Sequence, residues 1–467
     1  MLRRILDSAW LYFAGAALLL VIAVLTQFEV RVPSRPIAPA SEITSLGERE
    51  HLNVVFILID TLRADRLGIY GYDRPTSSTI DAFASQGVVF KNVISQSSWT
   101  KASMASMWTG TLPANNGVVR FNHVLPQEAL LPAEVFREAG YRTAGIWRNG
   151  WVAPNFGFDQ GFEFYLNPKP GRERQKHQSG HPSGRVLPGT DEDIILSTFE
   201  FIDSFGQERF FLYLHFMDLH QYVYEENSAL FGTSYSDVYD QSIHWTDRLV
   251  SLVVERIDAA GQLENTILVI ASDHGEAFRE HGIEGHAKNL YSEVVNVPLI
   301  IAFPFRLNPG IEVEARVSNI DIWPTLYDLA GLPPLSGVDG RSLVPLMLAA
   351  AGEPGAEPLE ERVEIAHLDR RWGSTKESDP MVSVTDKNMR LLWRVETPKL
   401  SELYDLDADP GEQQNLYGTD AASAERLQTL AQDYYENGAS PWGVDAVEVE
   451  LDELRLNQLR ALGYMIR

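Results

Sequence analysis

Continuous apolar runs alternate along the chain with stretches in which apolar residues recur at helical spacing. The runs resemble strands that are buried on both faces of a parallel sheet, and several of them end at a polar or acidic residue. They cover Asn53–Asp60, Phe210–His215, Thr266–Asp273 and Val297–Phe303. The helical patterns cover Thr79–Ser85, Leu130–Ala139, Asp191–Phe205 and Ser236–Ala260. This alternation predicts an α/β fold with a large, mostly parallel sheet flanked by helices.

The N-terminal segment is apolar without any polar face. Residues 8–28 carry no charge, and at 1.5 Å per residue a helix of that length spans roughly 31 Å, enough to cross a bilayer. We predict a single transmembrane helix at 8–28 behind a short tail at 1–7. Arg3 and Arg4 favour an inside N-terminus, so the catalytic part would be exported to a periplasmic or extracellular location. The alternative is a cleaved signal peptide with a small-residue site at residues 38–40.

The remaining chain divides by composition. Residues 29–50 are rich in proline and are predicted to form a linker between the membrane and a catalytic domain at 51–350. A second break near 351–361 precedes a smaller C-terminal α+β subdomain at 360–467. Its strand-like segments are Val363–Leu368, Met381–Asp386 and Met389–Val395, and Leu451–Tyr464 is predicted to be a helical tail.

Charge and composition exclude several classes of function. The 39 Lys and Arg residues face 64 Asp and Glu residues, and a net charge of −25 provides no basic surface for the phosphates of nucleic acid. The absence of cysteine excludes disulfides, thiolate metal sites and cysteine nucleophiles. Any chemistry must therefore come from oxygen and nitrogen side chains.

Asp60, Thr100, Asp273 and His274 are the candidate metal ligands. Asp60 and Asp273 end predicted strands, and the carboxyl ends of parallel strands gather at one edge of the sheet. Two carboxylates, an imidazole and a hydroxyl suit a divalent ion such as calcium, magnesium, manganese or zinc. Thr100 precedes a helical stretch, so an ordinary helix cap is its alternative role.

These segments resemble the sulfatase family of the alkaline phosphatase superfamily. The segment Asp60–Tyr72 resembles the first metal-binding segment of that family, Phe211–His220 its substrate-pocket histidine segment, and Ser272–Gly282 its second metal segment. Later signatures match at Tyr291–Ile301, Val317–Leu346 and Leu403–Leu416. The resemblance implies the alkaline-phosphatase/sulfatase-like fold, a divalent metal ion and an anionic ester as the substrate.

The chain departs from the family pattern at the nucleophile. Sulfatases use a formylglycine made from Cys or Ser within Cys/Ser-x-Pro-Ser/Ala-Arg, whereas Thr100 takes that position here and the Pro and Arg are missing. The family's Gly-Lys-Trp-His segment is replaced by Gly145–Asn149 (GIWRN), although Arg148 can supply charge. A threonine nucleophile resembles the phosphoester-processing relatives in the superfamily. The departure therefore favours phosphoric over sulfuric esters.

Further site residues follow from the resemblance. Thr100, Lys288, His220 and His286 are the expected catalytic residues, and Arg63, Asn149 and Lys101 the expected substrate-binding residues. Lys101 neutralises the transition state or points into solvent, and Arg63 contacts substrate or braces Asp60. His220 and His286 act on the ester or serve as hydrogen-bonded structural groups; with Asp218 they form an alternative second metal site.

Three functional hypotheses result. The first is a membrane-anchored, metal-dependent sulfatase-family hydrolase that cleaves phosphate or sulfate esters through Thr100, with the metal as Lewis acid and nucleophile generator. The second is a transferase that moves a phosphoryl-linked head group, of the phosphoethanolamine or phosphoglycerol type. The third is an inactive binding protein that retains the sulfatase fold. Bound metal and ester turnover distinguish the first two from the third.

Overall fold

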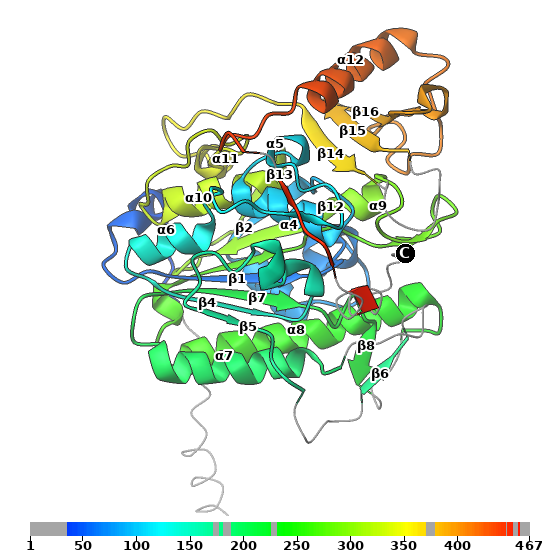
Figure 1. Cartoon of the computed structure of the whole chain (residues 1–467). Coiled ribbons are helices and arrows are strands. Elements are labelled where there is room, and N and C mark those ends of the chain that lie inside the picture. Colours follow the sequence, from blue (N-terminus) through cyan, green and yellow to red (C-terminus); the bar gives the residue numbers. More distant parts are fainter. Residues whose placement is uncertain are drawn as a thin grey trace, which may run out of the picture. The chain divides into compact units, whose positions relative to one another are not determined.

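The protein is built around an eight-stranded mixed sheet (Figure 1). The computed structural model describes residues 35–170, 177–180, 188–225, 231–369, 379–444, 446–451 and 456–457. The strand order is β13-β2-β12-β9-β1-β7-β4-β5, and only β12 runs antiparallel to its neighbours among these strands. In sheet order the bounds are β13 Ile311–Ser318, β2 Val88–Ile94, β12 Asn296–Ala302, β9 Thr266–Ala271, β1 Asn53–Ile59, β7 Phe210–Phe216, β4 Arg142–Trp147 and β5 Phe164–Leu166. The four predicted strands are confirmed as β1, β7, β9 and β12.

Helices cover both faces of this sheet (Figure 1). Alternate residues of β1 face opposite layers, Val55 toward one apolar cluster and Phe56 toward the other. The first layer holds the helices α3 Ser78–Ala84, α7 Asp191–Phe205 and α8 Tyr235–Ala259. The second holds α4 Thr100–Thr109, α6 Pro132–Glu138, α10 Ile322–Leu329 and α11 Val344–Ala350. The four predicted helices are confirmed as α3, α6, α7 and α8.

Part of the predicted linker at 29–50 packs on the body instead. The segment η1 (Ala40–Glu48) is a 3-10 helix whose Ile43 and Leu46 are buried in the core. The backbone N–H of Ala38 donates to Arg306 O at 3.0 Å. The linker prediction is therefore wrong for residues 36–48. It rested on the proline content of the segment, but two apolar residues spaced three apart are enough to anchor one helical turn.

The C-terminal part forms its own four-stranded antiparallel sheet. Its order is β14-β15-β16-β17, with β14 Glu364–Leu368, β15 Met381–Asp386, β16 Met389–Arg394 and β17 Glu402–Asp405. Helix α12 (Ala421–Asn437) packs against this sheet and closes a small apolar cluster. The backbone of this part bonds to the body where His367 N donates to Gln96 O at 2.8 Å. Strand β17 was not predicted.

Short elements connect these layers. They are η2 Ala64–Arg66, η3 Gly68–Tyr70, α5 Pro113–Asn116, β3 His123–Val124, η4 Gly150–Val152, η5 Pro154–Phe156, β6 His177–Ser179, β8 Val223–Glu225, η6 Leu263–Asn265, β10 Ala277–Phe278, β11 Glu284–Gly285, α9 Ser292–Val295, η7 Asn319–Asp321, η8 Pro398–Leu400 and β18 Val447–Glu448.

Within the described ranges, no helix combines the length and apolar character needed to cross a membrane. The predicted transmembrane segment 8–28 and the tail 1–7 lie outside the described residues. So does most of the predicted C-terminal helix at 451–464.

We predict that Ile43→Ala lowers the free energy of unfolding by about 2–5 kcal/mol, because it empties a buried site under η1. Chemical denaturation of the purified protein measures this change. The neighbouring exposed position provides the control, since Thr44→Ala should stay within about 0.5 kcal/mol of wild type. Equal, small effects of both changes would mean that η1 is not anchored.

Candidate active site

Strand topology gathers the predicted site residues at one edge of the large sheet. Strands β9, β1, β7 and β4 are parallel neighbours, so their carboxyl ends coincide. Asp60 directly follows β1, and Asp273 and His274 lie just beyond the end of β9. Asn149 follows β4, and Thr100 begins α4.

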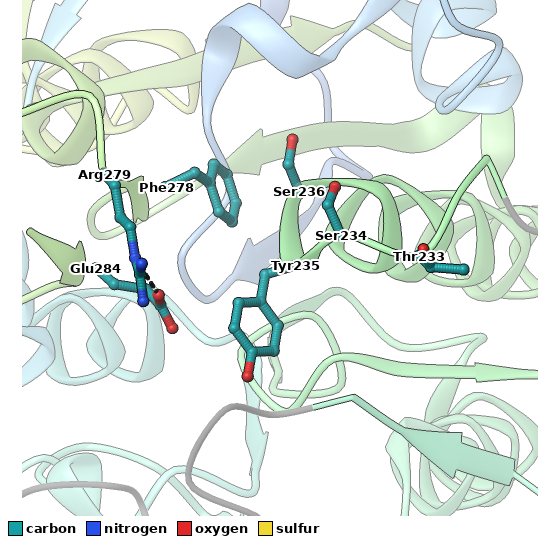
Figure 2. Close-up of a pocket in the computed structure, with 7 residues that line it drawn as sticks. All are labelled: Thr233, Ser234, Tyr235, Ser236, Phe278, Arg279 and Glu284. Atoms are coloured by element: carbon teal, nitrogen blue, oxygen red, sulfur yellow. Dashed lines mark hydrogen bonds and ion pairs between the residues drawn. The ribbon is translucent and has the colours of Figure 1, made fainter. Parts of the chain in front are cut away.

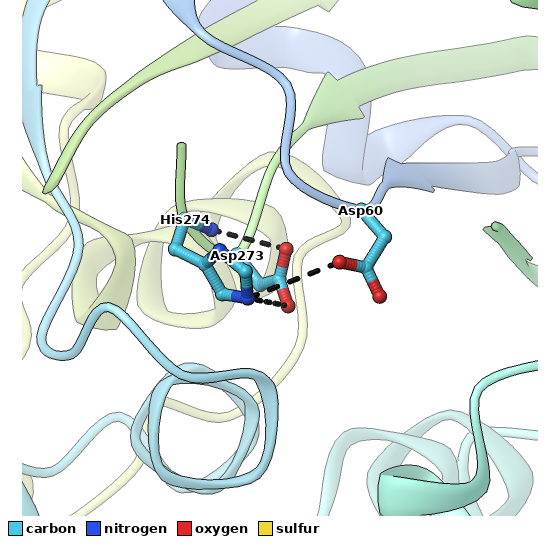
Figure 3. Close-up of side chains that lie close together, drawn as sticks. All are labelled: Asp60, Asp273 and His274. Atoms are coloured by element: carbon cyan, nitrogen blue, oxygen red, sulfur yellow. Dashed lines mark hydrogen bonds and ion pairs between the residues drawn. The ribbon is translucent and has the colours of Figure 1, made fainter. Parts of the chain in front are cut away.

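Asp60, Asp273 and His274 form a compact buried cluster (Figure 3). Three ligand atoms, one from each residue, lie within 4.8 Å of one another. His274 Nε2 is 3.4 Å from Asp273 Oδ2 and 3.8 Å from Asp60 Oδ1. Asp273 Oδ2 and Asp60 Oδ1 are buried without a hydrogen-bond partner. Buried carboxylate oxygens normally have partners, so this pair fits the coordination of a cation.

A strained turn orients Asp60 and Asp273. Thr61, which follows Asp60, has a φ of 65°, an uncommon conformation for a β-branched residue. Its backbone N–H donates to Asp273 Oδ1 at 3.3 Å, and its carbonyl accepts from Tyr239 OH at 2.6 Å. These two hydrogen bonds hold the Thr61 backbone in its strained conformation. Strain of this kind is typical of functional sites.

The electrostatics of the cluster follow from like charges buried together. Burial would raise the pKa of Asp60, but nearby imidazoles, with His220 and His215 foremost, lower it well below its ordinary value. Burial and the charge of Asp60 raise the pKa of Asp273 to about 6. Burial would lower the pKa of His274, but the two carboxylates raise it. Positive charge is therefore favoured between these carboxylates.

The backbone fixes the tautomer of His274. The ring Nδ1 lies 3.0 Å from Gly275 O, and a carbonyl only accepts, so Nδ1 carries the proton. Nε2 then presents a lone pair. It lies 3.2 Å from Thr100 Oγ1, which places the predicted nucleophile directly beside the cluster.

Asn149 and helix α4 complete the surroundings of Thr100. Asn149 Nδ2 donates to Asp60 Oδ2 at 2.5 Å and lies 3.4 Å from Thr100 Oγ1. Thr100 is the first residue of α4, where unpaired backbone N–H groups favour an anion. Ser103 Oγ on the same helix donates to Asp273 O at 2.6 Å, which ties α4 to the cluster.

Two site residues were missed by the sequence analysis, His215 and Tyr213 on β7. His215 Nε2 lies 3.1 Å from Asp60 Oδ2, and Tyr213 OH lies 2.6 Å from His215 Nδ1. Both side chains are fully buried. The available signal was His215 itself, a histidine at the end of an apolar run. That run was predicted to be a buried strand, and His215 was given no role in the site.

His220 and His286 lie beside the cluster of Asp60, Asp273 and His274. The His286 ring centre is 4.5 Å from that of His274, and the His220 ring centre is 4.9 Å from that of His286. His286 Nδ1 lies 3.2 Å from Glu276 Oε1. Lys288 is exposed, and its ammonium donates to Glu284 O at 2.5 Å. The structure thus brings the two histidines to the site and places Lys288 on the adjoining loop.

The side chain of Arg63 is engaged in structural contacts. Arg63 pairs with Asp65 Oδ2 at 2.7 Å and Glu280 Oε1 at 2.5 Å, and it donates to Glu276 O at 2.8 Å. These contacts brace the segment after His274. A substrate-binding role for Arg63 stays a prediction that this geometry does not favour.

Lys101 is fully buried and does not point into solvent. Its ammonium donates to Phe121 O at 2.5 Å and His123 O at 2.8 Å, and it lies 3.9 Å from the centre of the Phe156 ring. Burial lowers its pKa well below the ordinary value. Thr100 and Lys101 are successive residues of α4, so their side chains point about 100° apart around the helix axis. Lys101 therefore points into the protein interior.

A pocket of about 600 Å³ adjoins the hairpin that leads to His286 (Figure 2). Tyr235 and Phe278 present aromatic rings to it, and Arg279 and Glu284 form an ion pair at its edge. Strands β10 and β11 carry Phe278 and Glu284 opposite each other. The pocket therefore combines two aromatic rings with a charged edge.

Comparisons with known proteins agree with this geometry. The family model for sulfatases matches residues 52–332, and the model for the C-terminal part of N-sulphoglucosamine sulphohydrolase matches residues 280–436. An ulvan-active sulfatase from Formosa agariphila is 25% identical over 405 residues, covering 78% of this chain and 77% of the relative. Arylsulfatase A from Homo sapiens is 28% identical over 440 residues, covering 81% and 86%.

Solved structures share the fold. The phosphonate monoester hydrolase of Agrobacterium radiobacter superposes with a TM-score of 0.64 at 19% identity, covering 81% of this chain and 94% of that one. The matched family model spans more than half of the chain and includes Asp60, Thr100, Asp273 and His274. The chain belongs to the sulfatase family and has the α/β fold of the alkaline phosphatase type.

Proposed function

We propose that the protein is a metal-dependent hydrolase of anionic esters, with Thr100 as the nucleophile. The supporting observation is the position of Thr100 Oγ1, 3.2 Å from His274 Nε2 and at the edge of two buried carboxylates whose facing oxygens have no partner. Asp60, Asp273 and His274 would hold the ion, with Thr100 beside them. A divalent cation supplies Lewis acidity and lowers the pKa of a hydroxyl at this position.

The chemistry proceeds in two displacements. The hydroxyl of Thr100 gives its proton to water, and its Oγ attacks the phosphorus or sulfur centre and forms a covalent ester while the bond to the alcohol breaks. His220 or His286 gives a proton to the departing oxygen. Water then attacks the same centre, Thr100 Oγ leaves and takes a proton back from solvent water, and the histidine takes the proton that the attacking water loses. The N-terminal N–H groups of α4 stabilise the anion during both steps.

The charges around the site favour an ester with a single negative charge. Among the described residues, Arg63 is paired with two carboxylates, and so is Arg148, which contacts Asp191 and Asp218. Neither guanidinium is available to neutralise a second charge. Phosphodiesters and sulfate monoesters carry one negative charge near neutral pH, whereas phosphate monoesters carry close to two.

The identity of the nucleophile is our ground for favouring phosphorus over sulfur. Threonine has one hydroxyl and cannot become a formylglycine, so its covalent ester must be released by attack of water at the central atom. We favour a phosphoric ester on this ground. The names of the relatives point to sulfate esters, as in the ulvan-active sulfatase, while one structural neighbour is a phosphonate monoester hydrolase. The Tyr235 and Phe278 pocket would hold the alcohol part.

We further propose that the enzyme is anchored in a membrane by residues 8–28 and acts on the exported side. The support is the uncharged length of this segment and the two arginines before it.

Thr100→Ala is predicted to lower turnover at least about a thousandfold while the protein stays folded, since it removes the nucleophile and no helix cap. Steady-state kinetics with an aryl ester and a circular dichroism spectrum measure both properties. Thr109→Ala is the control, because that hydroxyl lies at the other end of α4 and bonds to Ala105 O. Near-wild-type turnover in Thr100→Ala would exclude the covalent mechanism.

Asp273→Asn is predicted to weaken binding of Mn²⁺ by at least about tenfold, because it removes a charge from the proposed ligand set. Isothermal titration calorimetry on the metal-stripped protein measures the Kd. Asp247→Asn provides a matched buried control, since Asp247 accepts hydrogen bonds from Thr79 N and Ile80 N away from the cluster. If both variants bind Mn²⁺ like wild type, the ion does not bind at Asp273.

Three aryl esters distinguish the substrate classes. We expect the highest kcat/KM for bis(p-nitrophenyl) phosphate, a lower value for p-nitrophenyl sulfate and the lowest for p-nitrophenyl phosphate, following the charge argument above. Release of p-nitrophenol is measured at one pH and saturating Mn²⁺. A preference for the phosphate monoester would contradict the charge argument, and a preference for the sulfate would reverse the assignment to phosphorus.

A further inference from the structure

A buried ion-pair cluster lies next to the site and has no part in the chemistry above. Arg148 Nη1 lies 2.8 Å from Asp191 Oδ1 and 2.6 Å from Asp218 Oδ1, and its Nη2 donates to Gly189 O at 2.7 Å. Both carboxylates are fully buried, and Arg148 is only 6% exposed. We call these three residues the Arg148 cluster.

The Arg148 cluster joins three segments of the chain. Asp191 Oδ2 accepts from the backbone N–H groups of Met217 and Asp218, at 2.8 and 2.6 Å. Asp218 Oδ2 in turn accepts from Asp191 N at 2.9 Å and from Trp245 Nε1 at 2.9 Å. The start of α7 and the loop after β7 are therefore locked to the residue that follows β4.

Asn149 is the neighbour of Arg148 and has separate contacts. While Arg148 is bound in the cluster, Asn149 Nδ2 contacts Asp60 Oδ2 and lies near Thr100 Oγ1. Asn149 Oδ1 accepts from Trp151 N at 2.9 Å, which sets the orientation of the amide. The backbone at 148–149 is thus held on one side by the cluster and on the other by the active site.

We infer that Arg148 is a positioning residue that holds Asn149 against Thr100 and Asp60. This inference rests on the proposed function, and it assigns Arg148 a different role from binding the ester. The guanidinium suits the task because its planar group reaches two carboxylates and a carbonyl at once, which a lysine ammonium on a flexible stem does not reproduce.

A double-mutant cycle between Arg148→Lys and Asn149→Ala tests this inference. The lysine keeps the positive charge between the buried carboxylates, so the variant is expected to fold, which circular dichroism verifies. We expect Arg148→Lys to lower kcat by about tenfold and to change KM by less than about threefold. In the Asn149→Ala background the same change should lower kcat by less than about twofold, because its effect passes through Asn149. Effects that multiply would overturn the inference.

Arg142→Lys is the matched control. Arg142 is the first residue of β4, at the opposite end of the strand from Arg148 and Asn149, and it pairs with Glu163 and Glu208 at 2.8 Å each. We expect it to leave kcat and KM at wild-type values. Loss of kcat in Arg142→Lys equal to that in Arg148→Lys would show a general effect of β4 and would overturn the inference.

A second readout separates this inference from the proposed function. The Kd for Mn²⁺ in metal-stripped protein needs no turnover, and Asn149 contacts Asp60, so the cycle is repeated with that Kd. If no ester is cleaved, the proposed function fails, while a coupled change in Kd still supports the positioning role. A crystal structure of Arg148→Lys in which Asn149 keeps its 2.5 Å contact with Asp60 overturns the inference whatever the kinetics.

Discussion

The rest of the site depends on one electrostatic constraint, the burial of Asp60 and Asp273 side by side. Two carboxylates that share a water-excluded site raise each other's pKa unless positive charge lies between or around them. The imidazoles around Asp60 hold its pKa well below the ordinary value, so this carboxylate stays ionised. A bound cation would provide further positive charge, and the hydroxyl of Thr100 lies beside it. The geometry of the neighbouring residues is consistent with this requirement.

Four of the eight strands, β1, β7, β9 and β12, could be predicted from the sequence because each is a largely apolar run. The direction of a strand is less visible. The apolar run at Asn296–Ala302 forms β12, which is antiparallel to β9. An apolar run does not indicate the direction of its strand, so this could not be predicted. Segment η1 was missed for a related reason, since a short amphipathic turn with proline before it has the composition of a linker.

The site was predictable where it depends on chain topology and less so where it depends on side-chain direction. Asp60, Asp273 and His274 end strands, so parallel pairing alone brings them together. The sequence places Lys101 next to Thr100, but a helix turns adjacent residues apart and Lys101 enters an aromatic interior. His215 was hidden within an apolar run because one polar residue in a buried strand indicates no partner until the adjacent strands are known.

The acidic character of the chain limits what holds an anionic ester at the site. A net charge of −25 repels anions at a distance, but salt screens this repulsion beyond roughly 8–10 Å. Selectivity must then come from charges in contact with the ester, and the structure commits both Arg63 and Arg148 to carboxylates. Under the proposed mechanism, a site that uses its guanidiniums to brace loops would leave neutralisation to a bound cation and the start of α4. Under the proposed mechanism, the charge of the ester is then a determinant of selectivity beside the nucleophile.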